Sequence, residues 1–187
     1  MMGIPYIEAY GEGEAQAAYL VENGDAWAVA SQDYDCLLFG AKRVVRNLAI
    51  NSNLGDLEYY NLKRVLDELD INREQLIDMG ILIGTDFSEG LKGVGAKTAL
   101  KLAKKGELEN KLAKLQEESS HDISEVREIF LNHNVNTDYK IRWKKPAKND
   151  IIDFLCEEHG FSQDRVSKAC DKLKNLNSSQ KSLDDWF

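Results

Sequence analysis

Five acidic residues stand where their side chains could gather around a metal ion: Glu12, Glu14, Asp33, Asp35 and Asp86. Asp33 and Asp35 closely follow the apolar run at residues 27 to 30, which indicates a short buried strand. Residues two apart on an extended chain face the same way, and α/β sheets bind ligands beyond the carboxyl ends of their strands. Because crowded carboxylates repel one another, hard divalent cations with oxygen ligands are the natural compensation.

Simpler explanations exist for parts of this set. Acids in the first turn of a helix interact well with the helix dipole, which would account for Glu12 and Glu14 if they stood alone. The Asp33 and Asp35 spacing is also common by chance. The metal hypothesis therefore depends on further motifs in the same chain.

A glycine turn with lysines provides one such motif. Lys92, Gly93 and Gly95 precede a helical stretch that carries Lys97 in its first turn. Glycines let backbone N–H groups approach a phosphate, and a helix N-terminus adds positive potential. The turn therefore predicts salt-sensitive binding to a nucleic-acid backbone without base recognition, the alternative being a glycine turn that only joins two packed helices.

The last eight residues carry two large aromatic rings where a chain end is normally solvated. The spacing of Gln180, Leu183, Trp186 and Phe187 resembles the peptide that replication and repair enzymes insert into the DNA sliding clamp (PCNA). Residues 175 to 179 are rich in Asn and Ser, which favours a detached linker. The alternative is a tail that folds back on its own domain.

The elements needed to hold these groups indicate the α/β class. We expect a helix at residues 14 to 23, strands near 27 to 30, 44 to 50 and 58 to 60, and only helices from residue 61 onward. The apolar run at 36 to 39 is not assigned by periodicity. Asn72 and Gln75 predict a capping box for a helix that ends near Ile83. The result is an incomplete, mostly parallel sheet flanked by helices, with an open outer edge that indicates an absent part of the fold.

Charge distribution and cysteine content favour some classes of protein and argue against others. The formal charge is −8, yet residues 92 to 105 and 140 to 148 each contain five basic residues and no acid, although either patch alone could be a solvated face. The three cysteines form no CxxC pair, which argues against a disulfide framework or a zinc site. Neither a signal peptide nor a membrane-spanning run is evident, so we expect a cytoplasmic protein of a prokaryotic type of cell with no membrane partner.

Three stretches, together with the tail, resemble flap endonucleases of the archaeal and eukaryotic kind: residues 11 to 18 (GEGEAQAA), 31 to 40 (SQDYDCLLFG) and 84 to 95 (GTDFSEGLKGVG). They follow one another in the order of that family. The chain departs from the family at Tyr10 and Gly11, where Pro-Ser is more usual, and at Ala96, where Pro is common.

The resemblance implies a catalytic, two-ion Mg²⁺ site for hydrolysis of DNA phosphodiesters, with Glu12, Glu14, Asp33, Asp35 and Asp86 as ligands. It also implies a helix-hairpin-helix at about residues 86 to 105 that grips duplex DNA and holds a K⁺ ion. Cleavage of flap or nicked duplex DNA is expected near the junction with a 5′ single strand, in replication and repair.

By the same resemblance the chain corresponds to the C-terminal half of the family. Residues 1 to 176 would form the C-terminal nuclease domain and residues 177 to 187 the clamp-binding tail. One ion would keep its protein ligands Glu14, Asp33, Asp35 and Asp86, whereas the other would keep only Glu12 and Glu14, so the isolated chain should be weak or inactive. We consider three hypotheses: a subunit completed in trans by an N-terminal chain, a non-catalytic DNA-binding adaptor tethered to the clamp, and a truncated fragment.

Overall fold

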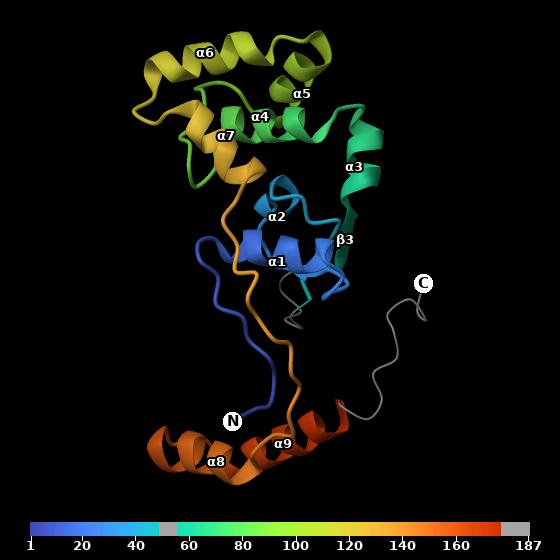
Figure 1. Ribbon diagram of the computed structural model, residues 1–187, viewed down its shortest axis with the longest axis vertical. Coiled ribbons are helices and arrows are strands. Elements are labelled where there is room, and N and C mark those ends of the chain that lie inside the picture. Colours follow the sequence, from blue (N-terminus) through green and yellow to red (C-terminus); the bar gives the residue numbers. More distant parts are fainter. Residues whose placement is uncertain (49–55, 177–187) are drawn as a thin grey trace. The chain divides into compact units, whose positions relative to one another are not determined.

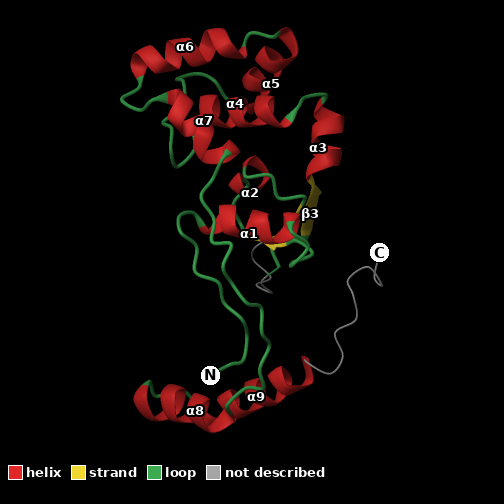
Figure 2. Cartoon of the chain, viewed as in Figure 1, coloured by secondary structure: helices red, strands yellow, loops and turns green. Residues whose placement is uncertain are grey.

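The computed structural model describes residues 1 to 48 and 56 to 176 and divides the chain into two units. One unit is Ala9–Val135, and the other combines Met1–Glu8 with the chain from Asn136 onward. The described chain is mainly helical, and the two units are considered separately below (Figure 2). The expected boundary at residue 176 coincides with the end of the described residues and stays a prediction.

A small sheet lies in the first unit. Its strands are β1 (Val29–Ala30), β2 (Arg43–Arg46) and β3 (Glu58–Asn61), in that spatial order. β1 pairs with β2 in parallel and β2 with β3 antiparallel. The α/β class is confirmed, whereas the sheet is mixed, so only one of its two pairings has the parallel direction expected. Within the described residues β1 pairs only with β2, which leaves its other edge unpaired.

Seven helices of the first unit are seen in the described residues: α1 (Gly13–Glu22), α2 (Asp35–Leu38), α3 (Leu62–Leu69), α4 (Arg73–Ile83), α5 (Ala96–Lys105), α6 (Leu108–Glu118) and α7 (Ile123–Leu131). The unassigned apolar run at 36 to 39 forms most of α2, and its four side chains are buried. A four-residue helix is too short to show a hydrophobic period, which explains why the run could not be assigned from the sequence.

Helix α4 is the centre of this unit. The predicted capping box is present: the Gln75 N–H donates to Asn72 Oδ1 at 2.8 Å, and the Asn72 N–H donates to Gln75 Oε1 at 2.9 Å. Ile77, Ile81 and Leu82 are fully buried because α4 packs against α2, α5, α6 and α7 (Figure 1).

A half-buried arginine at the start of α4 joins three helices. The Arg73 guanidinium donates to the Leu38 carbonyl at 3.0 and 3.2 Å and to the Phe130 carbonyl at 2.8 Å. These carbonyls lie at the C-terminal ends of α2 and α7, where backbone acceptors lack partners within the helix. Burial lowers the pKa of Arg73, yet the three hydrogen bonds satisfy its charge. The helix that carries Asp35 is therefore anchored to the central helix.

The second unit begins with two extended segments. The Lys144 N–H donates to the Gly3 carbonyl at 2.9 Å, and the Ala147 N–H donates to the Met1 carbonyl at 3.0 Å. Helix α8 (Lys148–Ile152), the π-helical turn η1 (Asp153–Glu158) and helix α9 (Gln163–Leu176) follow. None of the described helices combines the length and apolar character needed to cross a bilayer.

Candidate metal and nucleic-acid site

All five predicted acids lie in the first unit, on three segments. Glu12 is the N-cap residue of α1 and Glu14 lies in its first turn; the Glu12 side chain makes no capping hydrogen bond. Asp33 precedes α2, whose first residue is Asp35. Asp86 lies in the turn after α4.

Ser31 connects two of these segments. Its hydroxyl donates to Glu14 Oε1 at 3.5 Å and accepts from the Asp33 N–H at 3.1 Å. Asp33 in turn accepts from the Asp35 N–H through Oδ1 at 3.0 Å. The start of α1 and the segment that carries both aspartates are thus joined by a chain of hydrogen bonds.

Asp35 is influenced by its burial and by the other four acids. Partial burial, followed by the negative charges of Asp33, Asp86, Glu14 and Glu12, raises its pKa from 3.8 to about 6. The structure therefore brings all five acids into one electrostatic neighbourhood. As the side chains stand, no three Asp, Glu, His or Cys groups among the described residues have the arrangement needed to hold a metal ion. The donor set fits a hard divalent cation, whereas the side chains have not converged on one.

An aromatic cluster holds the two aspartate-bearing segments together. Phe39, four residues after Asp35, packs on Phe130 with ring centroids 4.9 Å apart. Phe87, next to Asp86, packs edge-on against Phe130 at 5.5 Å. Sequence reasoning assigned no role to these phenylalanines, because nothing local indicates that Phe130 lies between them.

The turn that carries Asp86 is tightly closed. The Leu91 N–H donates to the Leu82 carbonyl at 2.8 Å, and the buried Ser88 hydroxyl donates to the Ile81 carbonyl at 3.1 Å. Gly90 has a φ of +72°, and a Cβ there would lie 2.5 Å from the Ile83 carbonyl oxygen. Only glycine permits both the backbone conformation and this close approach.

The predicted phosphate-binding turn follows directly. The Val94 N–H donates to the Leu91 carbonyl at 3.0 Å, and Gly95 is the N-cap residue of α5. A Cβ at Gly93 or Gly95 would meet nothing within 4 Å, so the turn faces open space. Lys92 and Lys97 are exposed.

Helix α5 is divided into an apolar and a basic side. Ala99, Leu102 and Ala103 are buried, whereas its four lysines are exposed, and no ion pair of the described residues involves them or Lys92. This is the uncompensated positive surface expected for phosphate contacts. The helix-hairpin-helix and its K⁺ ion stay predictions.

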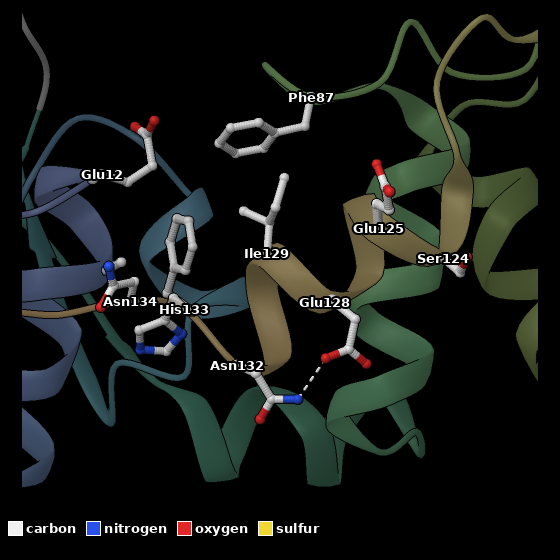
Figure 3. Close-up of a pocket in the computed structure, with 12 residues that line it drawn as sticks. Glu12, Phe87, Ser124, Glu125, Glu128, Ile129, Asn132, His133 and Asn134 are labelled. Carbon is white, nitrogen blue, oxygen red and sulfur yellow. Dashed lines mark hydrogen bonds between the residues drawn. The ribbon is translucent and has the colours of Figure 1, made fainter.

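A pocket of about 530 Å³ that the sequence did not indicate lies beside the acids. The start of α1 with Glu12 forms one wall, and Glu125 and Glu128 of α7 lie on the other (Figure 3). Ile129 points toward the Phe87 ring between them, and Glu128 accepts from the Asn132 side chain at 2.6 Å (Figure 3). The pocket therefore has an apolar interior with acidic groups around it.

The predicted clamp-binding residues Gln180, Leu183, Trp186 and Phe187 lie outside the described residues, so their role stays a prediction. The strand expected at 44 to 50 is shorter than predicted: β2 ends at Arg46, because Asn47 leaves the extended conformation with a φ of +59°.

The comparisons of the sequence and of the structure with known proteins agree with one another. Residues 3 to 86 match the sequence family described as XPG I-region. Flap endonuclease 1 of Methanobrevibacter smithii is 99% identical over the whole chain, which spans 57% of that relative. The solved flap endonuclease-1 from Methanococcus jannaschii superposes with a TM-score of 0.85 at 44% identity, over 95% of this chain and 56% of that one. Human GEN1 in complex with Holliday junction DNA has a TM-score of 0.75 at 26% identity, over 97% of this chain and 53% of that one.

Proposed function

The chain belongs to the flap endonuclease family, matching the C-terminal half of its relatives, and on that premise we propose that it supplies carboxylate ligands to a Mg²⁺-dependent nuclease site for 5′ flap DNA. The observation that carries the proposal is the neighbourhood of Asp35, where partial burial, together with the charges of four other acids, raises the pKa of the carboxyl to about 6. Such repulsion destabilises a protein unless a cation is bound there.

Glu14, Asp33, Asp35 and Asp86 would hold one ion, and Glu12 and Glu14 would contribute to a second. When bound, such ions supply an activated water and stabilise the leaving oxygen of a phosphodiester. The chain's own residues supply the negative charge that binds the ions. They also limit how the acids move: Ser31 holds Glu14 against the Asp33 backbone, and the aromatic cluster fixes the segments of Asp35 and Asp86.

The glycine turn and the exposed side of α5 would bind the duplex backbone. The turn offers positive charge from Lys92 and Lys97 and backbone N–H donors at Gly93 and Gly95, groups that suit phosphate oxygens. Human GEN1, solved with Holliday junction DNA, supports DNA as the substrate class.

The test compares three preparations of the chain: alone, mixed with the remaining segment of the M. smithii relative, and fused to that segment. We expect Mg²⁺-dependent cleavage of a 5′ flap in the fused form, and Asp33→Asn should abolish it. Cleavage in the mixture as well would identify a subunit completed in trans. An inert fusion would contradict the nuclease proposal.

A second function rests on the basic surface alone. If α5 and its turn bind duplex DNA while the acids hold no ion, the chain is a DNA-binding adaptor. Duplex affinity would then be sensitive to salt, independent of Mg²⁺ and complete without any added segment.

The C-terminal tail carries a separate proposal, recruitment by the sliding clamp. Trp186→Ala with Phe187→Ala should eliminate binding to the clamp and leave flap cleavage in solution intact. Unchanged clamp affinity would reject this role.

A further inference from the structure

Arg46, at the end of β2, holds the segment that carries Asp33 and Asp35 from two sides. Its Nε donates to the Gln32 carbonyl at 3.1 Å, on the residue just before Asp33. Its Nη1 donates to the Tyr34 hydroxyl, and its Cζ lies 3.9 Å from the centroid of the Tyr34 ring. Arg46 therefore fixes both the backbone before Asp33 and the side chain between the two aspartates.

The guanidinium is itself held in place by β3. Nη1 lies 2.7 Å from Glu58 Oε2, and Glu58 is the residue directly opposite Arg46 in the antiparallel pair. Tyr60 donates to the same carboxylate at 2.9 Å, and its hydroxyl lies 3.3 Å from that of Tyr34. Arg46 is thus part of a network that joins β2, β3 and the aspartate segment.

The aspartate segment needs such support. It connects the two-residue strand β1 with the four-residue helix α2, and elements this short contribute little rigidity of their own. Asp33 is exposed and repels Asp35, so electrostatics favours separation of the two carboxylates. A planar guanidinium can donate to several fixed acceptors at once and stack on a ring, which a lysine cannot reproduce.

We propose that Arg46 is a positioning residue that orients Asp33 and Asp35 for metal binding through Gln32 and Tyr34. The inference rests on the proposed nuclease site. Arg46 makes no hydrogen bond or ion pair with either carboxylate in the described structure, so it acts through the segment rather than as a ligand.

The competing explanation is that Arg46 only stabilises the sheet, and Arg43 provides the matched control. Arg43 lies on the same strand, donates through Nε to the Trp27 carbonyl and lies over the Trp27 ring at 5.1 Å. Like Arg46, it combines a hydrogen bond to a backbone carbonyl with a contact to an aromatic ring, but both involve Trp27, which precedes β1. Arg46 also pairs with Glu58, a contact that a lysine could keep. Arg43→Lys and Arg46→Lys therefore perturb the same two kinds of contact, of which only those of Arg46 involve the aspartate segment.

Two measurements on the full chain test the proposal. Amide hydrogen exchange, followed residue by residue, should accelerate by at least about 10-fold at Asp33 and Asp35 in Arg46→Lys, with α4 unchanged. Mn²⁺ affinity, followed by the paramagnetic signal of free Mn²⁺, should fall by about 10-fold. Arg43→Lys should change both quantities by less than about twofold at these residues. Tyr34→Phe, which keeps the ring but removes the hydroxyl, should give part of the Arg46→Lys effect.

Equal effects of the two arginine variants, or unchanged exchange at Asp33 and Asp35 in Arg46→Lys, would overturn the positioning role. Absence of Mn²⁺ binding by the wild-type chain would instead count against the proposed metal site. In that case hydrogen exchange, which needs no metal, still decides whether Arg46 orders the segment.

Discussion

The acidic neighbourhood and the basic helix α5 hold their charges in opposite ways. The acids come from three segments, and partial burial followed by the charges of the four other acids raises the pKa of Asp35 to about 6. The lysines of α5 project from one regular helix into solvent, unpaired within the described residues. Acids from several segments in one neighbourhood suit a small ion that several oxygens must surround, whereas lysines spread along one helix suit a long polyanion. The two regions should therefore respond differently to the same kind of mutation.

The largest expected effect is on chemistry and belongs to the acidic region. In the fused protein, Asp33→Asn should lower Mg²⁺-dependent flap cleavage by about 10³-fold, because under the proposed function it removes a metal ligand and with it several kcal/mol of transition-state stabilisation. Binding to duplex DNA without Mg²⁺ should not weaken, since Asp33 contributes no positive charge. Single-turnover cleavage and fluorescence anisotropy separate the two quantities. A parallel loss of duplex affinity would contradict the division between the regions.

The next largest effect is expected on stability, from a mutation in the turn that connects the two regions. Gly90→Ala should lower the free energy of unfolding by about 3 kcal/mol, because the new Cβ would lie 2.5 Å from the Ile83 oxygen at a positive φ. Gly93→Ala is the matched control: its φ is +85° but its Cβ would meet nothing within 4 Å, so it should lose only about 1 kcal/mol. Urea unfolding measures both. Similar losses would show that the closed turn is less constrained than the structure indicates.

A smaller effect is expected from single lysines of the basic region. Lys97→Ala should weaken duplex binding by about threefold to tenfold and reduce the slope of log affinity against log salt by about one. Flap cleavage at saturating DNA should be retained. Lys114→Ala on α6, which removes a lysine paired with Glu118, should leave the salt slope unaltered.

The smallest effect concerns stability and pH. Because the folded-state pKa of Asp35 is raised, the carboxyl is protonated in both states below pH 3.8 and carries no penalty there. As pH rises from 3.8 through 6, ionisation increasingly favours the unfolded, metal-free chain. Asp35→Asn should therefore stabilise the metal-free protein by about 1 kcal/mol at pH 7, a value reduced for partial exposure, and by nothing at pH 3.5. A gain of equal size at both pH values would exclude this cause.

Local signals in the sequence predicted some elements well. The capping pair Asn72 and Gln75 defined the start of α4, and its end at Ile83 was also correct. The acids were identified as a set because each stands beside a predicted strand or helix end. The interactions between them were not predictable: Phe130 contacts Phe39 and Phe87 across long sequence separations, and Arg46 of β2 contacts Tyr34 at the start of α2. Such contacts depend on tertiary packing, and the hydrophobic periodicity of a single sequence does not show which distant residues meet.

The edge of β1 that pairs with no strand among the described residues has a geometric consequence. β1 leads directly into the segment of Asp33, so the C-terminal end of this edge lies next to that aspartate in the chain. An additional strand laid along β1 in the parallel direction would finish level with Asp33. A polypeptide that added this strand would place the residues at the C-terminal end of the strand next to the carboxylates. Under the proposed function, completion of the sheet and assembly of the ion site would then be coupled.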